Sequence, residues 1–447
     1  MDKKLKISFW ILIIFSFVPL AVAEESLPPL PPGPLILTSV KPEQLSPDYW
    51  INQLPDPDRL IKTDKELETF NEDIRAMVKD QVNIFDMAPV REGPSVREQI
   101  ELEYNTVKGR ILFGADDADI PKSLFENEIK PLLQWETIPD RLTIRWGAAA
   151  RATSVRALPS DVKMLEEKGD IEFDQLQFTL IKLWTPVAVY HESSDGKWFY
   201  VQASYARGWV KAQDIALFPN QDELKKYSKS DYFLVVTGES IPLFADPDLQ
   251  EPIQSLSMGT VLPLAAKTES NFAVWIPAGK AYVDLKADVS TGFLPFTQRN
   301  IIREAFKLLG SRYGWGGTYN GRDCSGFTQD IFLTVGVDMP RGSKTQAFVG
   351  TQLGWFIYKE DAEAKTETLK SALPGLTILR MPHHMMIYLG QVNGQFYVIH
   401  CTWAERYSMT SDAKNRINQV VVSDLTLNGQ SYLGSLFDRI ISINEVD

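Results

Sequence analysis

The sequence of 447 residues predicts an α+β protein with several domains. Three stretches differ in hydrophobic pattern: residues 46–138 have mostly helical spacing, residues 141–291 alternate short β-rich runs with turns, and residues 294–447 contain helices followed by strands. A chain of this length is also too long for one hydrophobic core. We therefore expect a helical N-terminal domain, two small β-barrels and a C-terminal α+β domain.

Residues 1–23 have the pattern of a secretory signal peptide. Three lysines precede an apolar run, which ends in the small-x-small cleavage pattern Ala21-Val22-Ala23. The run is shorter than the roughly 18 residues of a spanning helix, so we expect no stable membrane anchor. The prediction is an exported protein that is periplasmic or associated with the cell wall.

Composition excludes some classes of function. The net charge of −12 at pH 7 has the wrong sign for neutralising phosphates, so we expect no nucleic-acid partner. The only two cysteines, Cys324 and Cys401, cannot form a disulfide framework. They could form a single bond, or one of them could be a free thiol that carries chemistry.

Residues 24–138 are expected to form a proline-rich linker and a helical N-terminal domain. The linker, residues 27–35, has a polyproline II composition. Between residues 63 and 78 apolar side chains recur at helical spacing, and Thr63 stands three residues before Glu66 as in a capping box. Nothing in this part indicates catalysis, so we interpret it as a scaffold.

Residues 139–220 and 221–293 are expected to be the two barrels. Runs such as TLIKLWTPVAVY and WFYVQASYARGWV are separated by turns at the spacing of small barrels. The segment GWVKAQDIAL resembles the closing strand and short 3₁₀ turn of bacterial SH3 modules. The second region repeats this layout more than these letters, and the resemblance implies two SH3-like domains.

The segment RDCSGFTQDIFLTVG, residues 322–336, places a cysteine where a helix begins. Asp323 is a good N-cap, which sets Cys324 in the first turn. Free backbone N–H groups and the positive end of the helix dipole favour a thiolate there. We therefore expect Cys324 to be a nucleophile.

A nucleophilic cysteine needs a base, and the base needs a group that orients it. His384 opens the predicted strand HMMIYLG, and His400 lies near the end of the next, QFYVIHC. A two-residue Asn-Gly turn would send the two imidazoles to opposite faces. A three-residue loop that includes Val392 would place His384 opposite Thr402, with His400 diagonally beside it. We expect the three-residue loop.

Each of these residues also has a simpler structural interpretation. A lone buried cysteine usually packs as a small hydrophobic residue, and Cys401, which points away from the histidines in this register, is expected to do so. Single strand histidines are commonly core or edge residues. The combination of Cys324 at a helix start with two histidines on adjacent strands favours catalysis.

Several motifs together resemble the NlpC-type cell-wall cysteine peptidases, a papain-like family. They are LLGSRYGWGGTYNGRDCSGF, MPRGSKTQ, HMMIYLG and VIHC, within residues 301–440. The resemblance implies that Cys324 attacks, that His384 is the base and that His400 orients it. It also implies a peptidoglycan stem peptide as the substrate, cut beside γ-linked D-glutamate, with no cofactor and no metal.

Members of this family that carry SH3 modules hold the free amine of an N-terminal L-alanine. The aspartate and serine that flank the cysteine do so, and they correspond to Asp323 and Ser325. The serine of MPRGSKTQ, Ser343, lies in the same subsite. The resemblance thus implies L-Ala-γ-D-Glu-diamino acid peptides as substrates.

A tyrosine of the first SH3-like domain also reaches the cleft in those members. Tyr205 is the candidate because it precedes the GWV segment, and Tyr190 and Tyr200 are the alternatives. An aromatic residue at this place has an equally good structural interpretation, because strands favour aromatic side chains.

The chain departs from the family pattern at three places. The family's PGDL is PGLT here, without the acid, and residues 358–371 are expected to be a charged surface insertion. The glycine two residues after the base is Met386, which leaves less room near the base. None of these departures changes the predicted triad.

We interpret the chain as a γ-D-glutamyl-L-diamino acid endopeptidase that acts on peptides with a free N-terminal L-alanine. One alternative is a muramoyl-alanine amidase or an acyltransferase with the same triad. The other is a wall-binding protein without catalysis, in which the SH3-like domains carry the function.

Overall fold

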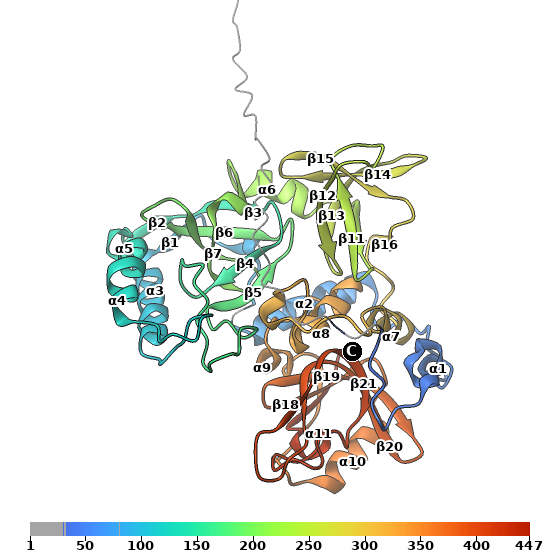
Figure 1. Cartoon of the computed structure of the whole chain (residues 1–447). Helices are drawn as coiled ribbons and strands as arrows, with labels where there is room; N and C mark the ends of the chain where they lie inside the picture. The colour runs from blue at the N-terminus through green and yellow to red at the C-terminus, as the bar shows by residue number, and fades with distance from the viewer. Residues whose placement is uncertain (1–29, 31–32, 80) are drawn as a thin grey trace, which may run out of the picture. The chain divides into compact units, whose positions relative to one another are not determined.

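The computed structural model describes residues 30, 33–79 and 81–447. The predicted signal peptide and most of the proline-rich linker lie outside the described residues. Among the residues that are described, no helix is both long and apolar enough to cross a membrane. Figure 1 shows helices together with several antiparallel sheets, so the prediction of an α+β multidomain protein is confirmed.

The second helix of the N-terminal part, α2 (Asp64–Met77), begins at the predicted capping box. The Thr63 hydroxyl accepts the N–H of Glu66, and the Glu66 carboxylate accepts the N–H of Thr63 at 2.8 Å. Leu67 and Phe70 are buried on one face, as their spacing predicts. The other elements of this part are η1 (Pro42–Leu45), α1 (Pro47–Ile51), η2 (Ile84–Asp86), β1 (Val90–Glu92), α3 (Gly93–Lys108), α4 (Lys122–Leu124), the π-helical η3 (Phe125–Ile129), α5 (Lys130–Leu133), η4 (Trp135–Thr137) and β2 (Arg141–Thr143).

Residues 145–218 and 233–291 each form a seven-stranded antiparallel sheet. The strand order is β5-β4-β8-β7-β6-β3-β9 in the first sheet and β12-β11-β15-β14-β13-β10-β16 in the second. The predicted 3₁₀ turn, η5 (Ala212–Asp214), follows the GWV strand. The strands of the first sheet are β3 (Arg145–Ala149), β4 (Thr153–Arg156), β5 (Gln177–Ile181), β6 (Pro186–Glu192), β7 (Trp198–Gln202), β8 (Arg207–Lys211) and β9 (Ile215–Phe218). After α6 (Gln221–Ser228), those of the second are β10 (Phe233–Val236), β11 (Ser240–Phe244), β12 (Pro252–Ser257), β13 (Val261–Lys267), β14 (Asn271–Ile276), β15 (Gly279–Asp284) and β16 (Val289–Thr291).

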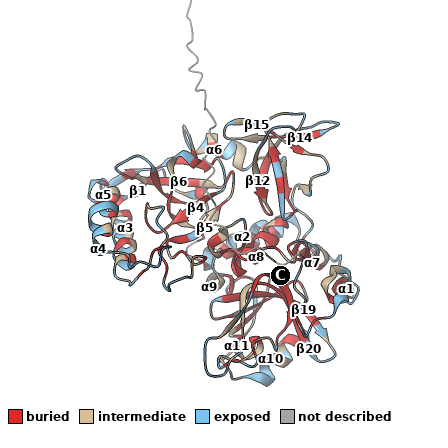
Figure 2. Cartoon of the chain, viewed as in Figure 1, coloured by how far each residue is buried: buried red, intermediate tan, exposed pale blue. Residues whose placement is uncertain are grey.

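The C-terminal part has one antiparallel sheet with helices on both faces. Its strand order is β17-β22-β18-β19-β20-β21. On one face α8 packs against β19 and β20, and on the other α10 and α11 contribute Leu369 and Leu436 to a second buried cluster. Figure 2 shows α8 and the neighbouring strands as mostly buried. The elements are α7 (Gln298–Lys307), η6 (Trp315–Gly317), α8 (Cys324–Thr334), α9 (Ser343–Gln346), β17 (Thr351–Trp355), α10 (Ala362–Ser371), β18 (Thr377–Met381), β19 (His384–Val392), β20 (Gln395–Arg406), β21 (Lys414–Asp424), α11 (Leu436–Arg439) and β22 (Ser442–Glu445).

The N-terminal helices do not share one core. Side chains of α1 and α2 belong to the buried cluster of the C-terminal part, and Asn71 Nδ2 donates to the carbonyl of Gly336 at 2.8 Å. Side chains of α3 and α5 belong to a cluster that includes core residues of both seven-stranded sheets, and the Tyr200 hydroxyl of the first sheet donates to Glu103 at 3.0 Å. The stretch 24–138, expected as one helical domain, is thus divided between two cores.

Helix α10 lies in the expected charged surface insertion, and most of its residues are exposed, but one face of the helix is buried. Lys365 and Leu369 are fully buried, and Lys365 Nζ donates to two backbone carbonyls at 3.0 and 3.3 Å. Leu369 belongs to the same buried cluster as Met386. The insertion therefore covers the sheet face that points away from α8. Met386, in place of the family's glycine, fills the core beneath it, and its expected effect on the room near the base stays a prediction.

The hairpin of β19 and β20 has the shorter of the two possible turns. Val392 pairs with Gln395, so Asn393 and Gly394 alone form the turn, with φ of 50° and 84°. These positive φ values are those of a type I′ turn, for which the Asn-Gly pair is favoured. The expected three-residue loop was therefore wrong.

A β-bulge before Gly390 restores the register that the longer loop was expected to supply. The pairing shifts by one residue there, so that Ile387 pairs with Ile399. Continued by three residues, this register sets His384 opposite Thr402 and keeps both histidines on one face of the sheet. An extra unpaired residue inside a strand leaves no strong signal in the sequence. The one-residue change in pairing was therefore expected in the turn and not in the strand.

The bulge predicts a specific cost at Gly390. Its φ is 125°, while a Cβ there would meet only Pro374 Cγ, at 3.6 Å. Gly390→Ala should therefore lower the free energy of unfolding by about 1–3 kcal/mol, through backbone strain and not through a clash. Urea denaturation followed by circular dichroism measures this. The control Gly394→Asn should lose less, because asparagine tolerates positive φ; a Gly390→Ala variant as stable as wild type would contradict the role given to the bulge.

Candidate active site

The first turn of α8 carries Cys324 and is capped by Asp323, as predicted. Asp323 Oδ1 accepts the N–H of Gly326 at 2.8 Å, and Oδ2 accepts the N–H of Gly316 at 3.0 Å. The two oxygens thus tie the helix start to the preceding loop. This holds the cysteine against the beginning of β19.

The Cys324 thiol is nearly enclosed, with 7% of the residue exposed. Burial, and then the charge of Asp323, raise the pKa of this thiol to about 12, although the N–H groups of Met385 and Ser325 act in the opposite direction. The backbone donors of the helix start thus lower the pKa of the thiol, as expected, but the loss of hydration outweighs them. The raised pKa favours the neutral thiol, which calls for a base that takes its proton.

The thiol lies beside the backbone of the predicted base. Cys324 Sγ donates to the carbonyl oxygen of His383 at 3.9 Å. Among the described residues, no hydrogen bond joins Cys324 to the imidazole of His384, which is itself 7% exposed. The structure therefore brings the cysteine to the start of β19 without forming the thiol–imidazole contact.

His384 and His400 form a buried pair. His384 Nε2 and His400 Nδ1 are 2.7 Å apart, with the two rings at 75°, and His400 Nε2 is 3.0 Å from Ser423 Oγ. Burial lowers the pKa of His400 to about 3, and burial, the neighbouring imidazole and Arg439 lower the pKa of His384 well below its usual value. Both imidazoles are therefore neutral near pH 7, which is the form in which one of them can act as a base.

Asp323 and Ser325 are joined to Arg341, a residue that the sequence analysis missed. Arg341 Nη2 lies 2.5 Å from Asp323 Oδ2, Nη1 donates to Ser325 Oγ at 2.8 Å, and Nε donates to Thr179 of the first sheet at 2.7 Å. Burial alone would raise the pKa of Asp323, but the charge and hydrogen bonds of Arg341 outweigh it and lower that pKa. Asp323 is therefore an ionised and paired carboxylate.

The signal for Arg341 was present in the motif MPRGSKTQ. Only the serine of this motif, Ser343, was interpreted from the sequence, and it lies half-buried at the start of α9. Gln346 of the same motif donates from Nε2 to the carbonyl of Ser325 at 2.8 Å. The arginine and glutamine of this motif thus hold the first turn of α8, and the role of Ser343 toward a substrate stays a prediction.

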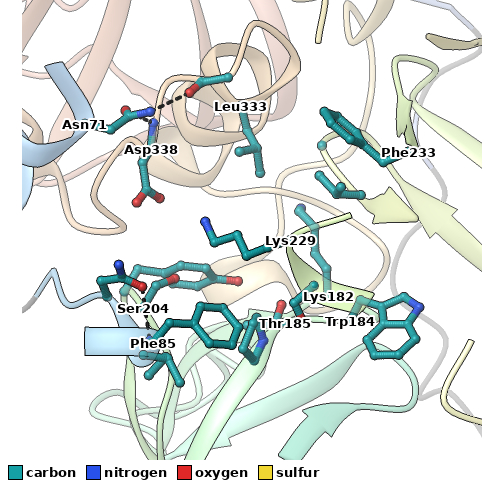
Figure 3. A pocket seen from close by; sticks show the side chains of 18 of the residues that line it. Asn71, Phe85, Lys182, Trp184, Thr185, Ser204, Lys229, Phe233, Leu333 and Asp338 are labelled. Atoms are coloured by element: carbon teal, nitrogen blue, oxygen red, sulfur yellow. Dashed lines mark hydrogen bonds between the residues drawn. The ribbon is translucent and has the colours of Figure 1, made fainter. Parts of the chain in front are cut away.

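Tyr205 lines a cavity of about 530 Å³ (Figure 3). Lys182 of the first sheet and Leu333 and Asp338 of the C-terminal part also line it. The Tyr205 hydroxyl donates to the carbonyl of Leu180 at 3.4 Å, and burial raises its pKa to about 12. Neither the cysteine nor its flanking aspartate lines this cavity. A contact of Tyr205 with a substrate amine therefore stays a prediction.

The alternative tyrosines of the same sheet have other partners. The Tyr190 hydroxyl accepts from Arg91 at 3.1 Å, and the Tyr200 hydroxyl donates to Glu103. Both partners belong to the N-terminal helical part. Of the three tyrosines, Tyr205 is the one whose surroundings include the C-terminal part.

Two residues of the loop before β5 contact aromatic side chains of the C-terminal part. The ring of Phe173, in the loop before β5, is 5.5 Å from that of Trp315 and 5.2 Å from that of Trp403. These rings pack against the buried cluster that contains Cys324. Glu172, 5% exposed, accepts from Trp403 Nε1 at 2.8 Å. Sequence analysis missed both because they lie in a loop without a motif; the one signal was an aromatic residue within a polar segment.

Ion pairs fix α8 to both sheets. Asp330 of α8 pairs with Lys182 of the first sheet at 2.6 Å and with Arg322 at 2.7 Å. Arg322 Nη2 also donates to the carbonyl of Glu239, beside the second sheet, at 2.9 Å. Among the described residues, no group of His, Cys, Asp or Glu side chains has the arrangement of a metal site.

Cys401 is a core residue, as predicted. It is free and fully buried, and its Sγ lies 3.0 Å from the carbonyl oxygen of Arg322. Cys324 is free as well, so the described chain contains no disulfide.

Family models match two parts of the chain. Residues 310–423 match the NlpC/P60 family, and residues 163–211 match an SH3 domain of the SH3b1 type. The chain carries an NlpC/P60 domain. The predicted resemblance of this part of the chain is thereby confirmed.

Proteins similar to this chain include curated peptidases. A γ-D-glutamyl-L-lysine dipeptidyl-peptidase of Bacillus cereus is 24% identical over 302 residues, which are 64% of this chain and 78% of that protein. A probable endopeptidase p60 of Listeria monocytogenes is 38% identical over 98 residues, 21% of this chain and 17% of that protein. The solved structure of an NlpC/P60 endopeptidase from Photobacterium damselae subsp. piscicida covers 93% of this chain and 99% of its own, with a TM-score of 0.73 and 17% identity, and it supports the fold.

The lowered pKa of His400 predicts a stability that depends on pH. The unfolded chain takes up a proton at this residue below about pH 6.5, whereas the folded chain does so only near pH 3. Stability is therefore lost as the pH falls below 6.5, and His400 alone should remove about 2 kcal/mol of unfolding free energy between pH 7 and pH 5. Urea denaturation at both pH values measures the loss.

The variant His400→Asn should show a shallower loss over the same range. The exposed neighbour His383 supplies a control, since His383→Asn should keep the wild-type dependence. Identical pH dependence of His400→Asn and wild type would contradict the assignment of a buried neutral imidazole.

Proposed function

We propose that the chain hydrolyses the bond between γ-D-glutamate and the diamino acid in peptidoglycan stem peptides. The observation that carries this proposal is the thiol of Cys324 beside the carbonyl of His383, which directly precedes His384, together with the hydrogen bond between the imidazoles of His384 and His400. A nucleophile, a base and an orienting group are what acyl transfer by cysteine requires. The relative named for γ-D-glutamyl-L-lysine supports this choice of bond.

In the proposed mechanism the thiol proton goes to Nδ1 of His384. Nε2 is engaged by His400, and Nδ1 is the ring nitrogen closer to the strand backbone, where Sγ lies. The thiol exchanges the carbonyl of His383 for this nitrogen, since catalytic hydrogen bonds commonly tighten only when substrate binds. Sγ then forms a bond to the γ-carbonyl carbon as its proton leaves.

Collapse of the tetrahedral intermediate completes the first half of the reaction. Backbone N–H groups at the start of α8 stabilise the oxyanion. The C–N bond breaks, the His384 imidazolium gives its proton to the leaving amine, and a thioester remains on Cys324. Water, deprotonated by the same Nδ1, then cleaves the thioester and restores the thiol.

The enclosure of the site favours a small, free peptide over an intact cell wall. Cys324 and His384 are each 7% exposed, and Phe173 of the first SH3-like part packs against Trp315 and Trp403 of the C-terminal part. A short peptide can enter such a site, whereas glycan strands would need a long open groove. This supports action on peptides released from the wall.

The free amine of L-alanine is proposed to bind at Asp323, with Ser325, Ser343 and Tyr205 around it. Asp323 is already paired with Arg341, so the ammonium group must share or open that ion pair. A carboxylate can accept from both partners, because its two oxygens offer several lone pairs.

Product analysis tests the function. Purified protein is given free L-Ala-γ-D-Glu-diaminopimelate and, separately, intact sacculi, and new amines are identified by mass spectrometry. We expect cleavage of the free tripeptide to L-Ala-γ-D-Glu, no comparable release from sacculi, and no cleavage by Cys324→Ala. Cys401→Ser is the matched cysteine control and should stay active. Cleavage at the muramoyl-alanine bond would replace the proposal with the amidase, and equal cleavage of both substrates would exclude the free-amine requirement.

Tyr205→Phe should weaken selection for the free amine.

The two histidines should differ in their kinetic effect. His384→Ala removes the base and should lower kcat by about 10²–10⁴-fold. His400→Asn keeps an amide that can accept from the imidazole, so its loss should be much smaller. Rate constants at saturating tripeptide measure both, and equal losses would contradict the assigned roles.

A further inference from the structure

Ser423 ends a chain of hydrogen bonds that begins at the proposed base. Its hydroxyl lies 3.0 Å from His400 Nε2, on the strand next to that of His400. Ser423 is fully buried, and it pairs across the ladder with Val398, so its side chain is on the same sheet face as the two imidazoles. The chain of contacts therefore runs from His384 through His400 to Ser423.

The hydrogen bonds of this chain can have either of two donor–acceptor directions. In one, His384 Nε2–H donates to His400 Nδ1, and His400 Nε2–H donates to Ser423 Oγ. In the other, Ser423 donates to His400 Nε2, and His400 Nδ1–H donates to His384 Nε2. The second direction puts the remaining proton of neutral His384 on Nδ1, so this nitrogen could not accept a proton from the thiol.

Catalysis selects between these directions. Once His384 has taken the thiol proton it is an imidazolium, and an imidazolium can only donate. Its Nε2–H then needs a lone pair on His400 Nδ1, which forces the His400 proton to Nε2. In this buried place that N–H needs an acceptor, because an unpaired buried donor costs about 1–3 kcal/mol.

We propose that Ser423 is a positioning residue that accepts the Nε2–H of His400 and so holds the proton pattern in which His384 can act as the base. This inference rests on the proposed roles of the two histidines, and it adds a fourth residue to the proposed triad. Ser423 contacts neither the thiol nor the proposed substrate subsite, and it acts through His400 alone.

The same sheet contains a matched control. Ser442, on β22, is also fully buried, and its hydroxyl has no hydrogen-bond partner among the described residues. Ser442→Ala and Ser423→Ala therefore remove the same atom from comparable surroundings. Only the second removes a contact with an imidazole.

The experiment combines kinetics with histidine NMR. Ser423→Ala should lower kcat for the free tripeptide by about 10- to 100-fold, as part of the 10²–10⁴-fold that a positioned base contributes, with KM almost unchanged. Ser423→Thr, which keeps the hydroxyl, should restore most of the rate, and Ser442→Ala should match wild type. In protein labelled with ¹⁵N-histidine, His400 should carry its proton on Nε2 in wild type and shift toward Nδ1 in Ser423→Ala.

The two readouts separate this inference from the proposed function. A wild-type protein that does not cleave the tripeptide would refute the substrate, while the NMR measurement would still decide the position of the proton. A His400 proton on Nδ1 in wild type would overturn the inference about Ser423. So would a Ser423→Ala variant with wild-type kcat and an unchanged tautomer, even if the peptidase activity were established.

Discussion

The buried hydrogen bond between His384 and His400 fixes how β19 and β20 must pair. Two side chains on adjacent strands meet only if they share a face, and a slip of one residue would move every side chain of a strand to the other face. The Asn-Gly turn alone would set the wrong register. The bulge before Gly390 corrects it, and the pair then lies in a core that keeps both rings neutral.

The start of α8 is also held in place by side-chain contacts, and one of these comes from the first sheet. Thr179 holds Arg341, Arg341 holds Asp323, and Asp323 caps the helix that carries the cysteine. The enclosure that results has a chemical consequence. Loss of hydration and the neighbouring carboxylate both raise the pKa of the thiol, so they favour its protonated form.

The insertion before β18 and the methionine at position 386 fill the same region of the core. A glycine at this position would leave the face under α10 without a side chain, and cavities in a core are costly. Met386 and Leu369 instead share one buried cluster, and the buried ammonium of Lys365 is satisfied by backbone carbonyls. The change lies on the sheet face that points away from α8, so it alters the support of the strand and leaves the proposed nucleophile in place.

Local signals in the sequence determined the elements. The capping box at Thr63, the N-cap at Asp323, the 3₁₀ turn after GWV and the two strands with histidines each depend on residues close in the chain, and each is present in the structure. The motifs likewise determined the family and the residues to examine.

Tertiary structure alone decided how these elements act together. The bulge, the division of the N-terminal helices between two cores, the pairing of Asp323 with Arg341 and the position of Phe173 all depend on contacts between residues far apart in sequence. The state of the Cys324 thiol also had to come from the fold. The pattern of a helix start shows the backbone donors near a sulfur atom, whereas its pKa depends on how much water the rest of the chain excludes.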